Sequence, residues 1–150
     1  ENWPKQEKAI SIRGLTAGMA FHLADCCHPV PGDRIVGLRQ AGKGVQVHAI
    51  DCLSLASGVD ADWLDLSWGE RTTGAVGRIR IVLYNRPGTL AEAAGIFAGN
   101  RANIASLESS NRDELFSTYE VDLEVTDLAH LTRIVSALRA SDAVAEAERI

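Results

Sequence analysis

The sequence predicts an α+β protein made of two small units. A stretch of glycine and small polar residues, GERTTGAVG at 69–77, separates a first unit, 1–70, from a second, 71–150. In the first unit, short alternating hydrophobic runs around glycine turns favour a small antiparallel sheet module with one helix. In the second unit, strand and helix periods follow the order β-α-β-β-α-β, which predicts a ferredoxin-like fold.

Composition narrows the class of protein. The chain is 46% hydrophobic, which suffices for packed cores, and its net charge of −5 argues against a basic nucleic-acid module of the usual kind. No apolar run is long enough to suggest a membrane partner, and the polar start does not resemble a signal peptide. Met19 is the only methionine, so we interpret the chain as a piece of a longer protein. An odd cysteine count of 3 favours a reducing, cytoplasmic setting over a disulfide scaffold.

The elements of the first unit are short. A hairpin is the clearest, because two alternating runs at 34–40 and 44–50 flank the glycine-rich turn AGKG. We expect four further segments: a strand at 9–14, an irregular stretch at 22–33, a short helix at 51–58 that ends at Gly58, and a last strand at 63–68.

The elements of the second unit have longer periods. We expect strands at 77–85, 103–110, 117–125 and 144–150, helices at 89–100 and 127–141, and a turn at 111–114. Thr89 with Glu92 forms a capping-box pattern at the start of the first helix, and Gly99-Asn100 suits its end. Both helices should cover one face of the sheet, which leaves the other face and one edge free to pair with a second copy.

The segment NRPGTL, between the first strand and the first helix of the second unit, is a candidate carboxylate site. Gly88 allows close backbone approach, and the following helix start offers unpaired N–H groups and a positive dipole end. Asn103, which leads the second strand, could hold an ammonium or amide group. The alternative is that Gly88 makes a tight turn and Asn103 ends a loop, and the residues alone favour that alternative.

The cysteines of the first unit form a second candidate site. Cys26, Cys27, His48 and Cys52 are ligand types that tetrahedral zinc prefers. If the short helix started near Ala49, His48 and Cys52 would face one point. Adjacent cysteines can reach one ion only from an irregular turn, because neighbouring residues on a strand point to opposite sides. Buried structural thiols and a redox-sensitive thiol set remain open as alternatives.

The second unit resembles an ACT domain through NRPGTLAEAAGIFAGNRANI. The resemblance implies an amino-acid sensor that pairs side by side, with the ligand between one subunit's first loop and the other's second strand. The implied binding residues are Asn85, Arg86, Pro87, Gly88, Thr89 and Leu90 on one wall, and Asn103 and Ile104 of a partner on the other. Asn85 stands where many members have Asp. Because Leu90, Ile104 and Leu107 are apolar, we expect valine, isoleucine or leucine as ligand.

The first unit resembles the conserved-cysteine module of long RelA/SpoT-type proteins, which make and hydrolyse (p)ppGpp. That family's pattern, C-C-x-P-x-P-G-D-x-I-x-G followed by a glycine-rich hairpin and V-H-x-x-D-C, is present in full. The module is described as zinc-finger-like or as a ribosome-intersubunit contact, and an ACT domain follows it in that family. The resemblance implies a non-catalytic regulatory piece of a stringent-response (p)ppGpp synthetase/hydrolase, with a structural zinc as its possible cofactor. Its implied partners are an amino acid, a second copy and the N-terminal catalytic domains of the same chain.

An alternative function is a ribosome or rRNA interaction module whose ACT domain serves only as a dimerisation scaffold. Arg34, Arg39 and Lys43 lie on or near the hairpin and could contact phosphate. An ordinary solvated hairpin face explains the same residues equally well.

Overall fold

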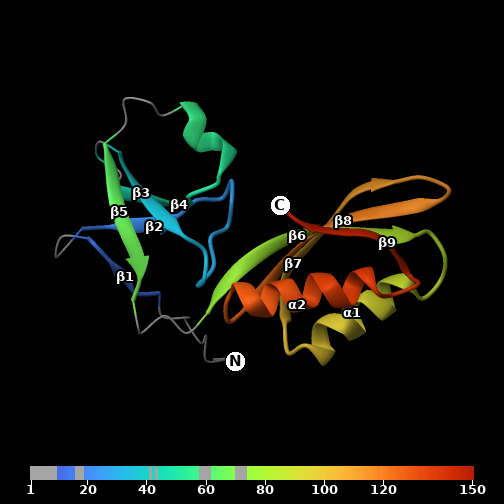
Figure 1. Ribbon diagram of the computed structural model, residues 1–150. Coiled ribbons are helices and arrows are strands. Elements are labelled where there is room, and N and C mark those ends of the chain that lie inside the picture. Colours follow the sequence, from blue (N-terminus) through green and yellow to red (C-terminus); the bar gives the residue numbers. More distant parts are fainter. Residues whose placement is uncertain (1–9, 16–18, 41, 43, 58–61, 70–73) are drawn as a thin grey trace, which may run out of the picture. The chain divides into compact units, whose positions relative to one another are not determined.

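The computed structural model describes residues 10–15, 19–40, 42, 44–57, 62–69 and 74–150, which form two compact units, Glu1–Ala75 and Val76–Ile150 (Figure 1). Two features of the sequence, the strand period and the glycine turns, account for most of the first unit. It is a 5-stranded sheet in the order β1-β5-β3-β4-β2. Its elements are β1 (Ile12–Arg13), β2 (Phe21–Leu23), β3 (Ile35–Gln40), β4 (Gly44–Ala49), the 3₁₀ helix η1 (Leu53–Ser57) and β5 (Trp63–Trp68).

The hairpin at the centre of the first unit is confirmed. β3 and β4 pair antiparallel from Ile35 opposite Ala49 to Gln40 opposite Gly44. Alternation along these strands sends one set of side chains inward, as strand geometry requires. The core cluster consists of Ile35, Val45, Val47 and Leu66, with partly buried side chains packed around it from β1, β2 and β5.

Three details of the first unit differ from the sequence-based expectation. The sheet is not wholly antiparallel, because β2 pairs parallel with β4, Leu23 lying opposite Val47. His22 and Leu23 therefore belong to a strand and not to an irregular stretch. The helix is a 3₁₀ helix that starts at Leu53, since Cys52 N–H donates to Ala49 O and Leu55 N–H donates to Cys52 O, the three-residue spacing of a 3₁₀ turn. Gly58, the expected helix stop, and Ala9 lie outside the described residues.

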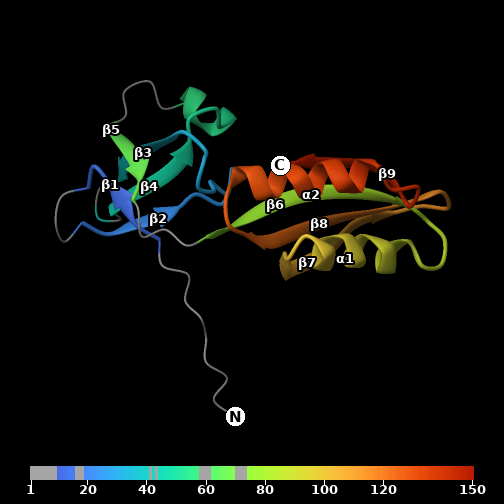
Figure 2. The same ribbon diagram turned by 60° about the horizontal axis from the view of Figure 1, so that its bottom comes forward.

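The second unit confirms the β-α-β-β-α-β order. Its elements are β6 (Ala75–Tyr84), α1 (Thr89–Gly99), β7 (Asn103–Arg112), β8 (Phe116–Val125), α2 (Leu128–Arg139) and β9 (Val144–Arg149). The 4-stranded sheet runs β7-β8-β6-β9, and both helices cover the same face of it (Figures 1 and 2). Ile79, Ile81 and Leu83 of β6 are fully buried, as are Phe97 of α1 and Leu131 of α2, so the core lies between sheet and helices.

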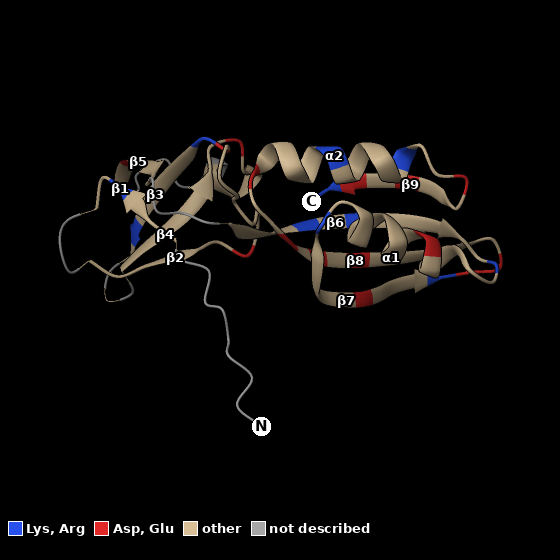
Figure 3. Ribbon diagram, turned by 90° about the horizontal axis from the view of Figure 1, so that it is seen from below, with Lys and Arg blue, Asp and Glu red and all other residues tan. Residues whose placement is uncertain are grey.

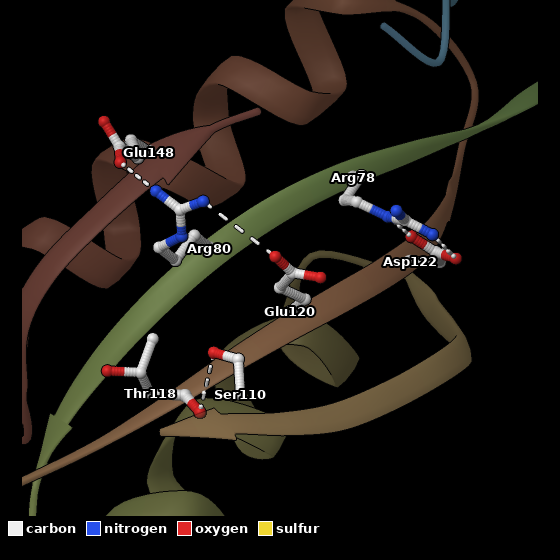
Figure 4. A network of polar contacts seen from close by, with 7 residues as sticks. All are labelled: Arg78, Arg80, Ser110, Thr118, Glu120, Asp122 and Glu148. Carbon is white, nitrogen blue, oxygen red and sulfur yellow. Dashed lines mark hydrogen bonds and ion pairs between the residues drawn. The ribbon is translucent and has the colours of Figure 1, made fainter. Parts of the chain in front are cut away.

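The opposite face of this sheet carries charged side chains. Arg78 forms a two-pronged pair with Asp122, at 2.7 Å and 3.1 Å, while Arg80 lies between Glu120 and Glu148 (Figure 4). The hydrogen bond to Asp122 raises the pKa of Arg78 above its ordinary value. Along the described part of this unit, Figure 3 shows basic and acidic positions interspersed rather than gathered into a basic stripe.

Two expectations for the second unit are wrong. Thr89 and Glu92 do not form a capping box, because Gly88 is the N-cap residue and Thr89 is already helical. The Thr89 hydroxyl instead donates to the Tyr84 and Arg86 carbonyls. The turn expected at 111–114 is shorter, because Asn111 and Arg112 pair with β8 as part of β7. The carboxylate of Asp113 closes it by accepting from Leu115 N and Phe116 N at 2.8 Å each.

Neither α1 nor α2 in the described part of the chain has the length and apolar character that a membrane span needs.

Candidate functional site

The structure brings the four predicted zinc-ligand residues of the first unit together. The ligand atoms of Cys26, Cys27, His48 and Cys52 all lie within 4.8 Å of one another. We call these four residues the thiol–imidazole cluster. The parallel pairing of β2 with β4 explains their convergence, because it places the ends of both strands at the same edge of the sheet. Cys26 and Cys27 follow the end of β2, and His48 and Cys52 lie at and just beyond the end of β4.

The adjacent cysteines reach one point because they occupy a turn. His28 N–H donates to Ala24 O at 3.1 Å, which closes a single helical turn around Asp25–Cys27. From this turn, Cys26 Sγ lies 3.4 Å and Cys27 Sγ 3.9 Å from His48 Nδ1. The expectation that a helix starting near Ala49 would aim His48 and Cys52 is wrong. His48 is on strand β4, and Cys52 is in the turn that precedes η1.

The PVPGD segment fixes the chain after the cysteines. Asp33 N–H donates to Val30 O at 2.9 Å, with Pro31 and Gly32 between them and Gly32 at φ 104°, as a type II turn requires. The Asp33 carboxylate accepts from Val30 N, and the indole N–H of Trp68 donates to Asp33 O at 2.9 Å. These bonds tie the turn to β5, so the cysteine segment is held at both ends.

The distances within the thiol–imidazole cluster suit a tetrahedral ion. With Zn–S bonds of about 2.3 Å and Zn–N bonds of about 2.0–2.1 Å, tetrahedral ligand atoms lie roughly 3.5–3.8 Å apart. Cys26 Sγ lies 3.5 Å from Cys52 Sγ, and the two thiol–imidazole distances are 3.4 Å and 3.9 Å. The donor set of three thiols and one imidazole is a zinc set, so the residues fit this metal.

The imidazole of His48 is oriented for metal binding. Its Nε2 lies 2.9 Å from Gln46 Oε1, an acceptor that also receives a hydrogen bond from Gln40 Nε2 at 3.2 Å. An amide oxygen cannot donate, so Nε2 carries the proton and Nδ1 presents its lone pair to the thiols. Burial, assisted by the charge of His22, lowers the pKa of His48, which favours the neutral ring that a metal ligand needs.

The thiols of the cluster differ in environment. Burial raises the pKa of Cys27 to about 12, against the opposing effect of a hydrogen bond from Ala49 N at 3.3 Å. Burial also acts to raise the pKa of Cys52, but hydrogen bonds from Ser54 outweigh it, and the pKa falls below its ordinary value. Cys26 is exposed, whereas Cys27 and Cys52 are half-buried. Reagents from solvent therefore meet Cys26 first.

The NRPGTL loop of the second unit uses its polar side chains within its own unit. Asn85 Nδ2 donates to Asp113 O at 2.7 Å, and Arg86 reaches the Asp142 carbonyl at 3.2 Å while stacking on Tyr84. Gly88, at φ 90°, starts α1 without a side-chain cap, and a Cβ placed there would meet open space. The loop therefore offers backbone groups at the helix start more readily than side chains.

Three large apolar side chains of the second unit are partly exposed. Leu90 of α1 is 36% exposed, and Ile104 and Leu107 of β7 are 36% and 40% exposed. A register shift between Ile104 and Ser106 lets Ile104 and Leu107, three positions apart, pair with the buried Leu123 and Val121 on the same face. We call Ile104 and Leu107 the apolar edge. Asn103, at the start of β7, donates to the Glu124 carboxylate at 3.1 Å.

The predicted phosphate contacts of the first unit have different surroundings. Arg39 forms an exposed ion pair with Asp62 at 3.4 Å, and Arg34 is exposed at a cavity of about 350 Å³ that Trp68 and Ile50 also line. Lys43 lies outside the described residues. Of the predicted phosphate contacts that the structure describes, Arg34 borders this cavity and Arg39 is in the ion pair.

Comparison with known proteins finds relatives of both units. Residues 10–69 match the RelA/SpoT RIS domain, and residues 76–149 match the ACT domain. The chain is 36% identical over 149 residues to a GTP pyrophosphokinase rsh of Brucella abortus, covering 96% of this chain and 20% of that protein. It is 30% identical over 155 residues to the GTP pyrophosphokinase of Escherichia coli, covering 100% of this chain and 21% of that protein.

The chain spans about a fifth of the length of these curated relatives. Among solved structures, the ACT domain from GTP pyrophosphokinase of Chlorobium tepidum aligns with a TM-score of 0.46 and 24% identity, over 52% of this chain and 100% of that one.

Proposed function

The chain belongs to the RelA/SpoT family as the RIS and ACT domains of its C-terminal regulatory region, and we propose that it senses amino acids for catalytic domains that lie outside these 150 residues. The observation that carries the proposal is the start of α1. There a left-handed Gly88 opens the helix with no side-chain cap, and Leu90, which is 36% exposed, follows in the first turn. An amino acid has the matching halves, a carboxylate for helix N–H groups and a side chain for an apolar wall.

The ligand we propose is a branched-chain amino acid. The carboxylate would accept from the backbone N–H groups that open α1, within the segment Asn85, Arg86, Pro87, Gly88, Thr89 and Leu90. Asn103 and Ile104 of a second copy would complete the site. Leu90, Ile104 and Leu107 supply apolar surface without a charged group, which favours valine, isoleucine or leucine over polar amino acids.

The second copy would pair through the β7 edge of the ACT domain. β7 is an edge strand of the sheet, and the apolar edge lies along it. At the other edge strand, β9, the Arg139 side chain donates to the Ala147 carbonyl at 2.8 Å and so occupies a backbone acceptor. An open edge bordered by apolar side chains is suited to strand pairing with an identical strand, whereas an occupied edge is not.

The signal would travel as a shift between two arrangements of the whole protein. A ligand that prefers one arrangement stabilises it by its difference in affinity, typically about 1–3 kcal/mol in allosteric proteins. We propose that a bound amino acid favours (p)ppGpp hydrolysis over synthesis by the N-terminal catalytic domains, since plentiful amino acids should end the stringent response. We propose that the protein senses amino acids in the cytoplasm.

The thiol–imidazole cluster would hold a structural zinc ion. The three thiolates and His48 Nδ1 would complete four ligands, which matches closed structural sites better than catalytic sites with an open position. The ion would supply cross-links between the turn after β2, β4 and the turn before η1. Its role would be to keep the RIS surface in one shape.

Calorimetric titration of the purified protein with each of the twenty amino acids tests the sensor. We expect heat from valine, isoleucine or leucine, and a weaker response when Ile104 is changed to Asp. Absence of heat from all three branched-chain amino acids would contradict the proposal, whatever the zinc content of the sample.

A second candidate function is a contact with rRNA, with the ACT domain as a dimerisation scaffold only. Exposed Arg34 at the cavity lined by Trp68 favours it, because a guanidinium beside an aromatic ring can contact phosphate or stack on a base. A ribosome pelleting assay with Arg34→Glu, and separately with Arg39→Glu and Lys43→Glu, tests the three residues. Unchanged association in all three variants would count against this function.

A further inference from the structure

Two thiols of the cluster lie at a spacing that suits two ligands of one zinc ion and also leaves the two sulfurs in contact when no ion is bound. Cys26 Sγ is 3.5 Å from Cys52 Sγ, although the two residues are 26 positions apart in the sequence. Cys26 is exposed, and Cys52 is half-buried. We propose that Cys26 and Cys52 form an intramolecular disulfide when the protein meets a hydroperoxide, and that this bond and zinc binding exclude each other.

The surroundings select this pair from the three possible ones. Cys27 Sγ accepts a hydrogen bond from Ala49 N at 3.3 Å and is less exposed than Cys26, so backbone contacts hold it inside the turn. Cys26 and Cys27 are neighbours in one turn, and a disulfide between them would have to distort that turn.

The chemistry needs one hydroperoxide and no other reactant. The Cys26 thiolate attacks one oxygen of hydrogen peroxide, the O–O bond breaks, and the products are the Cys26 sulfenic acid and hydroxide. The Cys52 thiolate then attacks the Cys26 sulfur, the S–O bond breaks, and a second hydroxide leaves. Two protons convert both hydroxides to water. Two sulfurs have been oxidised by two electrons in total, and the peroxide has been reduced.

Cys52 is placed for the second step, because its Sγ lies 3.5 Å from Cys26 Sγ before any oxidation occurs.

The consequence for the metal follows from the ligand count. A disulfide removes Cys26 and Cys52 as thiolate ligands and leaves Cys27 and His48, too few for a closed tetrahedral site. The disulfide itself needs only the two thiols, whereas its effect on the metal rests on the zinc site proposed above. A thiol reductant would break the disulfide and allow zinc to bind again. The RIS domain would then respond to oxidants.

Peptide mapping tests the bond directly. The purified protein is treated with hydrogen peroxide, free thiols are alkylated, and trypsin digestion follows without reduction. Cleavage after Arg13, Arg34, Lys43 and Arg71 places Cys26 and Cys27 in the peptide 14–34 and Cys52 in the peptide 44–71. The proposed bond joins these two peptides, and a Cys26–Cys27 bond stays within 14–34.

We expect the joined peptides, with Cys27 alkylated, in protein that migrates as a single chain on a non-reducing gel. Cys26→Ser and Cys52→Ser should abolish the link, and Cys27→Ser, the matched control, should retain it. Circular dichroism checks that each variant is folded. If a variant does not fold, the peptide map of the wild-type protein still shows whether Cys26 and Cys52 are joined. A bond within 14–34, bonds between chains, or oxidation of Cys26 only to sulfinic acid would overturn the proposal.

Zinc release, followed with a metal-binding dye, tests whether the disulfide and zinc binding exclude each other. We expect peroxide to release zinc from the loaded protein, and dithiothreitol with added zinc to restore binding. Release without the joined peptides would refute the disulfide. The joined peptides in protein that never binds zinc would refute the zinc site and leave the disulfide standing.

Discussion

The Nε2 atom of His48 lies 2.9 Å from Oε1 of Gln46, two residues earlier on the same strand. Both side chains project from β4 on one face, and Gln46 thereby decides which imidazole nitrogen meets the thiols. A second contact from Gln40 holds the amide oxygen of Gln46 in place. The pair is the outer support that metal-binding histidines commonly have.

Changing Gln46 to Ala should therefore weaken zinc binding while leaving all four ligands in place. Loss of such outer partners typically costs about 10–100-fold in metal affinity. Competition with a chromogenic chelator measures the change. Gln40→Ala, which removes only the contact behind Gln46, is the control and should have a smaller effect; equal affinity in wild type and Gln46→Ala would show that Gln46 does not orient the ring.

Asn85 should stabilise the shape of the NRPGTL loop rather than contact the bound amino acid with its side chain. Its side chain donates to Asp113 O, and its backbone N–H donates to Leu115 O at 2.9 Å, which ties the loop to the β7–β8 turn. Asn85→Asp removes the donor and points a carboxylate at a carbonyl, so we expect a loss of about 1 kcal/mol of stability. Thermal unfolding measures it, and hydrogen exchange at 113–116 should rise; unaltered exchange there would contradict the role.

Gly88 and Gly95 should respond in opposite directions to the same substitution. Gly88→Ala forces a side chain into φ 90° and should cost about 1–2 kcal/mol, although the added methyl meets open space. Gly95→Ala, inside α1 with equal space around it, should instead stabilise by roughly 0.5–1 kcal/mol. Chemical denaturation distinguishes the two. If Gly88→Ala were as stable as wild type, backbone conformation would not explain the glycine.

Leu107 should be needed for pairing of two copies. Leu107→Lys places a charge in the apolar edge and should convert a dimer to monomers in sedimentation velocity runs. Leu115→Lys is the matched control, because Leu115 is 69% exposed in the β7–β8 turn, outside the apolar edge. A dimer that survives Leu107→Lys, or that is lost equally in Leu115→Lys, would place the interface elsewhere.

Local patterns were sufficient for the elements whose hydrogen bonds and periods are local. The hairpin of β3 and β4 and the alternation of Ile79, Ile81 and Leu83 were predictable, because a strand with one buried face repeats every second residue. The start of α1 was not, since Thr89 suits either a cap or the first helical turn. The left-handed Gly88 and the contacts of the Thr89 hydroxyl to Tyr84 and Arg86 settle it.

The candidate sites divide in the same way. The sequence by itself determined the order of elements, the RelA/SpoT-type cysteine pattern and the residue types of the thiol–imidazole cluster, because these are properties of neighbouring residues. Only the tertiary structure decided that the four side chains meet, since their meeting depends on β2 lying parallel to β4, a pairing between segments more than twenty residues apart. It likewise decided that Asn85 and Arg86 bond within their own unit, because their acceptors, the carbonyls of Asp113 and Asp142, come from turns far along the chain.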